Sequence, residues 1–108
     1  MPTVVASPSG ETIVVAEGTP VLATAGAGDV LGGIAVTLLA QMGDALHAGA
    51  LAAFAHGRAA AHVSARQVRG YTLADVIAEL PEVWALETEP RYPPVLCELP
   101  AVGEVDRA

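Results

Sequence analysis

The residues best suited to chemistry lie in one short loop, Gly26-Ala27-Gly28-Asp29, at a point where a helix is expected to begin. Glycines let the chain turn tightly and leave the amides of the first helical turn unobstructed. Those amides have no partner inside the helix, and the helix dipole adds positive potential, so the position attracts phosphate. Asp29 can then take a proton from a hydroxyl aimed at the phosphorus. The plainer interpretation makes Asp29 a first-turn carboxylate that the dipole favours.

The elements around this loop can be predicted from local patterns. Two β-branched segments, 3–6 and 12–16, flank the turn cluster Ser7-Pro8-Ser9-Gly10 and predict a hairpin ahead of the loop. The helix that follows the loop should run to about Met42 and is apolar on nearly every side, which is typical of a helix inside a larger protein.

Two further helices are predicted from their caps. Gly43 fits the end of the first helix, and Asp44 fits as the N-cap of an alanine-rich helix over 45–64. Thr72 stands three residues before an acid, a variant of the capping box that predicts a third helix over 73–80. Pro81 should end that helix or restart it as one further turn over 82–86.

Composition narrows the class of protein. The 108 residues are 53% hydrophobic but 4% aromatic, which indicates a folded, mixed α/β protein. Their net charge of −7 argues against nucleic acid or an anionic membrane as the main partner. Cys97 is the only cysteine and the three histidines form no i, i+4 pair, so no disulfide framework or metal motif is expected. The run 30–40 is too short to span a membrane, no targeting segment is visible, and a cytoplasmic location is expected.

The stretch from Leu22 to Ile34 resembles the signature of the ADP-dependent NAD(P)H-hydrate dehydratases, the carbohydrate-kinase-like domain of the YjeF family in the ribokinase-like superfamily. A helix containing His56-Gly57 and a final segment with Thr72, Asp75, Ile77 and Leu80-Pro81 follow in the family's order. The resemblance covers about residues 3–86. It implies an α/β fold, namely the C-terminal fragment of a three-layer α/β/α domain.

The resemblance also implies an activity. In the family, ADP phosphorylates the hydroxyl of the hydrated nicotinamide ring, and loss of phosphate regenerates NADH or NADPH and leaves AMP. Carried over by position, Gly26, Ala27 and Gly28 bind the phosphate of the nucleotide, while Asp29 contacts the NAD(P)H hydrate and acts as the catalytic base. ADP is the implied co-substrate and Mg²⁺ fits phosphoryl transfer, but no residue here is identifiable as a metal ligand.

Some positions depart from the family pattern and leave alternatives open. Ala27 stands where the dehydratases usually have Ser or Thr, and Gly32 where they usually have Ala. The loop itself matches the sugar and vitamin kinases of the superfamily equally well, although those kinases generally carry an acid at the position of Ala23. A catalytically silent remnant or interaction domain is the alternative of another class.

The family domain is considerably longer than this chain and carries its glycine loop in the last third. We therefore expect residues 1–87 to be the C-terminal part of such a domain, and 88–108 a proline-rich tail. The expected partners are the NAD(P)H hydrate, ADP, and either further copies of the chain or the missing N-terminal portion. Among other residues, His56, Phe54 and Trp84 are expected to be packing residues, and the arginines Arg58, Arg66 and Arg69 to lie on a solvated face.

Overall fold

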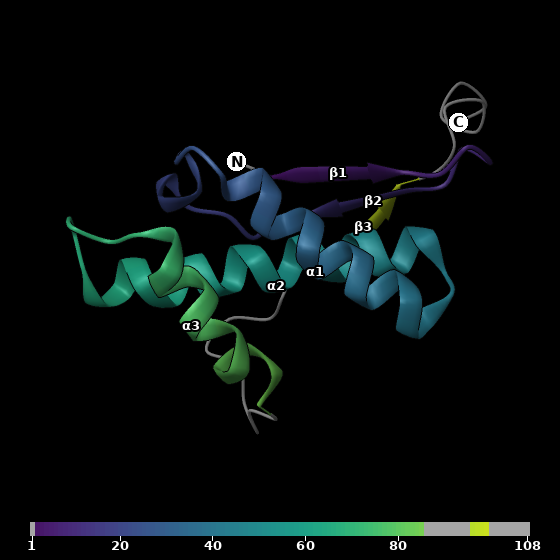
Figure 1. Cartoon of the computed structure of the whole chain (residues 1–108). Helices are drawn as coiled ribbons and strands as arrows, with labels where there is room; N and C mark the ends of the chain where they lie inside the picture. The colour runs from purple at the N-terminus through teal and green to yellow at the C-terminus, as the bar shows by residue number, and fades with distance from the viewer. Residues whose placement is uncertain (1, 86–95, 100–108) are drawn as a thin grey trace.

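The computed structural model describes residues 2–85 and 96–99 of the chain. Within them it forms a small antiparallel sheet and three helices, an α/β arrangement (Figure 1). The elements in chain order are β1 (Thr3–Ala6), β2 (Thr12–Val15), the 3-10 turn η1 (Pro20–Leu22), α1 (Ala27–Met42), α2 (Ala45–Arg66), α3 (Leu73–Trp84) and β3 (Leu96–Leu99).

The sheet has the strand order β1-β2-β3, with both pairs antiparallel. The predicted hairpin is confirmed, with Val4 opposite Val14. β3 was not predicted: it lies in the segment expected to be a tail, yet Cys97 pairs with Val14 on the far side of β2. The remainder of that segment, 86–95 and 100–108, lies outside the described residues. Among the described strands, β1 therefore forms one edge of the sheet.

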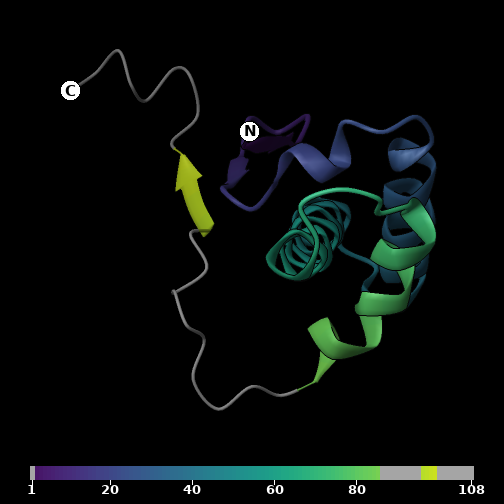
Figure 2. The same ribbon diagram turned by 90° about the vertical axis from the view of Figure 1, so that its left-hand side faces the viewer.

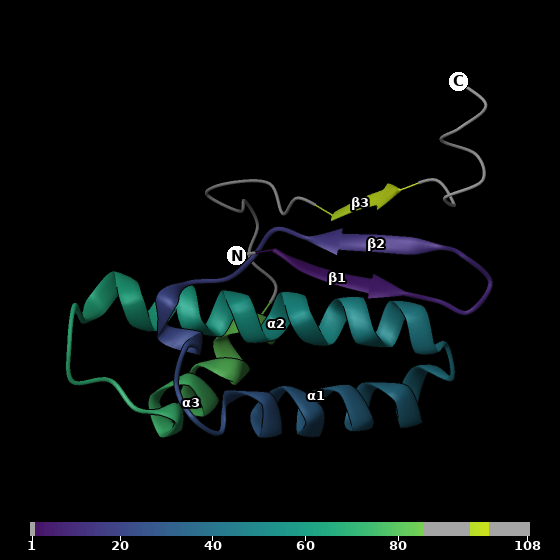
Figure 3. The ribbon, with the colours of Figure 1, turned by 90° about the horizontal axis from the view of Figure 1, so that it is seen from above.

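Helix α2 is the centre of the structure. It contacts the hairpin on one side and α1 and α3 on the other, as the end-on view of Figure 2 and the view of Figure 3 show. Alanines and a glycine supply most of its buried positions, so neighbouring elements can approach its backbone closely. On the sheet side Ile13 and Val15 pack against Leu46, Ala50 and Ala53.

The helix boundaries predicted at Gly43, Asp44 and Thr72 are confirmed, whereas α2 runs two residues past the predicted end, to Arg66. Gly43 ends α1 in the left-handed region with φ +69°, where a glycine costs least. Asp44 caps α2 by accepting a hydrogen bond from the His47 amide at 3.2 Å, and Thr72 with Asp75 forms the capping box of α3. The Thr72 amide donates to Asp75 Oδ2 at 2.6 Å. These caps are local interactions, which explains why the sequence pattern predicts them.

Helix α3 continues through Pro81 as far as Trp84. Pro81 is exposed and lies in the last turn, so its ring meets solvent and only one hydrogen bond near the helix end is lost. The further turn that the sequence allowed is therefore part of the same helix.

The apolar side chains of α1 are only partly buried. Ala27, Ile34 and Leu38 are its buried residues, whereas Val36 is 68% exposed and Leu39 and Met42 are also exposed. An exposed apolar helix face is expected where a further layer of protein belongs. None of the described helices is both long and apolar enough to cross a membrane.

Candidate functional site: a glycine loop between a groove and a buried histidine

The glycine loop adopts a conformation that requires Gly26. This residue caps α1 with φ +91°, in the left-handed region, and a Cβ placed there would lie 3.0 Å from Leu73 Cδ1. Its carbonyl accepts hydrogen bonds from the amides of Asp29 at 3.1 Å and Val30 at 3.3 Å, which closes the first turn of the helix. Gly26 thus starts α1 and leaves room for Leu73, the first residue of α3, to lie close to the loop.

The amides of the loop are not all available to a ligand. The Ala27 amide donates to the Thr24 carbonyl at 3.1 Å, and Ala27 is buried. Among the described residues the amides of Gly26 and Gly28 have no hydrogen-bond partner, and both glycines are exposed. Of the three residues expected to bind phosphate, two therefore present free N–H groups at the positive end of α1.

The backbone conformation at position 28 does not require a glycine. Its φ lies outside the left-handed region, and a Cβ added to it would meet no described atom within 4 Å. The space it leaves is open to a ligand that approaches the helix end closely. Asp29 follows it in the first turn, exposed, and its carboxylate makes no hydrogen bond with the described residues. The carboxylate is accordingly free to act on a ligand.

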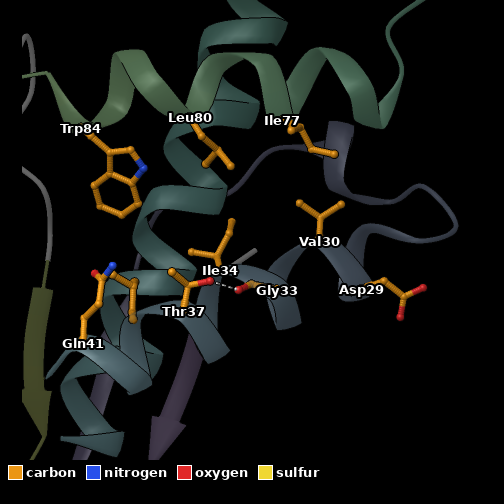
Figure 4. A pocket seen from close by; sticks show the side chains of 10 residues that line it. Asp29, Val30, Gly33, Ile34, Thr37, Gln41, Ile77, Leu80 and Trp84 are labelled. Atoms are coloured by element: carbon orange, nitrogen blue, oxygen red, sulfur yellow. Dashed lines mark hydrogen bonds between the residues drawn. The ribbon is translucent and has the colours of Figure 1, made fainter. Parts of the chain in front are cut away.

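Asp29 stands at one end of a groove between α1 and α3. The groove has a volume of about 620 Å³, the size of a small-molecule site. Its walls are mostly apolar and include Ile34, Leu80 and Trp84. Figure 4 shows Asp29 at the end away from Trp84, with its carboxylate turned outwards. Asp29 is the one charged side chain among the described residues that line this groove.

A second cavity lies beneath the segment that leads into the loop. It has a volume of about 350 Å³, and its walls include Thr19, Ala23, Leu31 and His56. His56 is 5% exposed, and its Nε2 has no hydrogen-bond partner in the described part of the chain. Burial lowers the pKa of the imidazole, which favours its neutral form.

A buried polar atom without a partner is costly. Nε2 of His56 is therefore suited to a ligand that offers it a hydrogen bond. The sequence pattern favours a packing role for His56, and only its pairing with Gly57 in the family pattern marks it out.

Two other expectations change. Trp84, expected in the core, is 46% exposed because it lies at the end of α3, on the rim of the groove. Arg58, expected on a solvated face, is 18% exposed and paired with Glu17. Arg66, paired with Glu79, is largely exposed as expected. No group of His, Cys, Asp and Glu within 2–85 and 96–99 could hold a metal ion.

A glycine loop at a helix start, with a carboxylate in the first turn, is a type of site that α/β enzymes use to bind phosphate. A family model described as NAD(P)H-hydrate dehydratase matches residues 1–82. The chain belongs to this family.

The curated relatives agree with this assignment. The bifunctional NAD(P)H-hydrate repair enzyme Nnr of Salinibacter ruber is 43% identical over 86 residues, which are 79% of this chain and 16% of the relative. The ADP-dependent (S)-NAD(P)H-hydrate dehydratase of Neisseria meningitidis serogroup B is 52% identical over 58 residues, 54% of this chain and 20% of the relative. The chain thus spans about a fifth or less of the length of these relatives. No solved structure matches it.

Proposed function

We propose that this chain supplies the phosphate-binding loop and the general base of an ADP-dependent NAD(P)H-hydrate dehydratase, acting as part of a complete domain. The observation that carries the proposal is the combination of two free glycine amides at the start of α1 with an unpaired carboxylate one residue later. The family match over residues 1–82 supports this reaction over that of a sugar or vitamin kinase.

In this proposal ADP lies across the N-terminus of α1. Its terminal phosphate receives hydrogen bonds from the amides of Gly26 and Gly28, while the base enters the cavity lined by His56. The position of the cavity supports this, because the cavity of about 350 Å³ borders the segment that leads directly into the loop. A neutral His56 can hydrogen-bond to a heterocyclic base in either ring tautomer.

Asp29 acts on the other substrate. Its carboxylate accepts the proton of the ring hydroxyl as the hydroxyl oxygen forms a bond to the terminal phosphorus of ADP and the bond to AMP breaks. The phosphate group then leaves the ring carbon, and the neighbouring ring carbon loses a proton that departs with it as hydrogen phosphate. The ring thereby regains its double bond, and the products are NAD(P)H, AMP and phosphate. No group of three or more metal-ligating side chains lies among the described residues, so a Mg²⁺ ion would be held mainly by the phosphates of ADP.

The proposal is tested on a complete domain, made by joining this chain to the upstream part of the Neisseria relative. We expect Asp29→Asn, which keeps the size of the side chain and removes the base, to lower turnover by roughly 10² to 10⁴. Nucleotide binding should persist because the glycine amides are unchanged. If the Asp29→Asn variant keeps the turnover of the unaltered domain, then Asp29 is only a first-turn carboxylate and the assigned role is wrong.

A second variant tests the phosphate contact. Gly28→Ala places a methyl group where the phosphate is proposed to lie, and KM for ADP should rise about tenfold or more, the value of a charge-assisted hydrogen bond. The matched control is Gly32→Ala, one turn further along α1, where a Cβ also meets no described atom within 4 Å. If both variants change KM equally, the phosphate does not bind at Gly28.

A further inference from the structure

The motif His56-Gly57 contains one residue to which the proposed function gives no role. Gly57 is buried in α2, facing the segment that connects β2 to the glycine loop. We name residues 17–24 the leading segment. It forms part of the wall of the His56 cavity and ends at the loop that carries the free amides.

Gly57 lets the leading segment lie directly on the backbone of α2. A Cβ added at Gly57 would lie 2.7 Å from both the carbonyl carbon and the carbonyl oxygen of Glu17, and 2.8 Å from its Cβ. The obstructing atoms belong mainly to the backbone and cannot swing aside as the end of a side chain could. Among the described helical glycines this is the closest such approach, so any larger residue would have to displace the leading segment or bend α2.

Arg58, next to Gly57, also holds the leading segment on α2, through an ion pair. Arg58 Nη1 donates to Glu17 Oε1 at 3.3 Å, and both side chains are 18% exposed. The partners are 41 positions apart in the chain, so the pair ties two distant segments together. An ion pair that is shielded from solvent loses less to screening than one on the surface.

The other end of the leading segment is fixed independently. Val21 is 2% exposed and packs with Ala59, Ala60, Val63 and Val76. The Thr24 hydroxyl donates to the Val21 carbonyl at 2.8 Å, which ties the beginning of the loop to this buried point. The leading segment therefore rests on α2 at Gly57 and again about one turn further along the helix.

We propose that Gly57 and the Glu17–Arg58 pair are positioning residues for nucleotide binding, because they hold the leading segment on α2 and thereby place the loop amides and the wall of the His56 cavity. This rests on the proposed function for its ligand. In this proposal Arg58 pairs with Glu17 and does not contact the phosphate directly.

The test uses the full chain and two measurements. Hydrogen exchange reports on the amides of Val21, Leu22, Ala23 and Ala27, which bond within the leading segment and loop, with the amides of α3 as an internal reference. Titration of the complete domain with ADP, the chain being joined to the upstream part of the Neisseria relative, gives the dissociation constant. The variants are Glu17→Gln, Arg58→Gln and the exchanged pair Glu17→Arg with Arg58→Glu, and the control is Glu11→Gln, an exposed residue of the hairpin turn.

We expect each single substitution to lower protection in the leading segment and loop about fivefold, with α3 unchanged, and to raise the ADP dissociation constant by a similar factor. The exchanged pair should recover most of both losses, and Glu11→Gln should alter neither. Recovery by exchange is the decisive result, because an arginine that touched phosphate directly could not be replaced by glutamate.

Three results would overturn the proposal. The first is unchanged hydrogen-exchange protection of the leading segment in the single variants. The second is a loss of protection in α3 equal to that in the leading segment. The third is an exchanged pair that recovers neither protection nor affinity, while Arg58→Gln abolishes ADP binding. If the unaltered complete domain does not bind ADP, the proposed nucleotide site fails, and the exchange measurement on the chain still decides whether Glu17 and Arg58 position the segment.

Discussion

Two glycine-to-alanine substitutions should change stability in opposite directions, and the structure supplies the reason. At Gly32 in α1 a Cβ meets no described atom within 4 Å, so alanine only improves helix propensity. The expected gain is roughly 0.5 to 1 kcal/mol. At Gly57 the same gain is opposed by the carbonyl group of Glu17, only 2.7 Å from the added carbon.

The size of that opposition follows from the contact distance. Ordinary van der Waals contact begins at 3.4 Å, so at 2.7 Å the leading segment must move by about 0.7 Å or α2 must bend. Overpacking a rigid interior site costs about 1–3 kcal/mol. After the gain in propensity of about 1 kcal/mol, Gly57→Ala should destabilise by up to roughly 2 kcal/mol.

The assay is urea unfolding followed by far-UV circular dichroism, at one protein concentration for all variants. Gly49→Ala provides an intermediate case, because its Cβ would lie 3.1 Å from Val5 Cγ1, the end of a side chain that can yield. The reasoning is refuted if Gly57→Ala is as stable as Gly32→Ala, since the leading segment would then not lie on α2.

The remaining predictions concern the surface and the ion pairs. The isolated chain should self-associate, because Val36, Leu39 and Met42 are exposed on α1 and β1 is an edge of the described sheet. Sedimentation is expected to show species above the monomer mass. A monomer with a sharp melting transition would contradict this prediction. Hydrogen bonds from Arg66, and more weakly from His62, lower the pKa of Glu79 below its ordinary value of 4.5. The stability from this pair is present above about pH 4.5 and lost as pH falls further, so the gap in urea midpoint between the unaltered chain and Glu79→Gln should narrow from pH 7 to pH 3.

Local interactions account for the parts of the fold that the sequence predicts. The caps at Asp44 and Thr72 and the left-handed Gly43 depend on residues within four positions of each other, so their pattern is visible in the sequence. β3 depends on pairing with β2, which lies more than 80 positions away. Local sequence patterns do not predict such a distant partner, so β3 was not predicted. The continuation of α3 past Pro81 depends on which face of the helix meets solvent.

The candidate site divides in the same way. Gly26, Gly28 and Asp29 stand out in the sequence because a phosphate-binding turn requires that spacing at a helix start. The engagement of the Ala27 amide by the Thr24 carbonyl depends on the exact path of the turn and has no sequence signal. The cavity at His56 arises only where the leading segment crosses α2, a contact between segments about 40 positions apart.

The proposed function requires one short loop to serve two substrates, and the geometry of helix α1 is compatible with this. Successive residues of a helix point about 100° apart, so Asp29 and Leu31 face different neighbours: Asp29 lines the groove shared with α3, and Leu31 lines the cavity that contains His56. The free amides of Gly26 and Gly28 lie at the start of the helix, next in sequence to Asp29 of the groove and close to Ala23 of the cavity. A nucleotide with its base in the cavity and its phosphate at the amides would leave the groove side of Asp29 open. In the proposed function the second substrate would approach the phosphorus from that side, so the order of residues in a single turn would separate nucleotide binding from proton transfer.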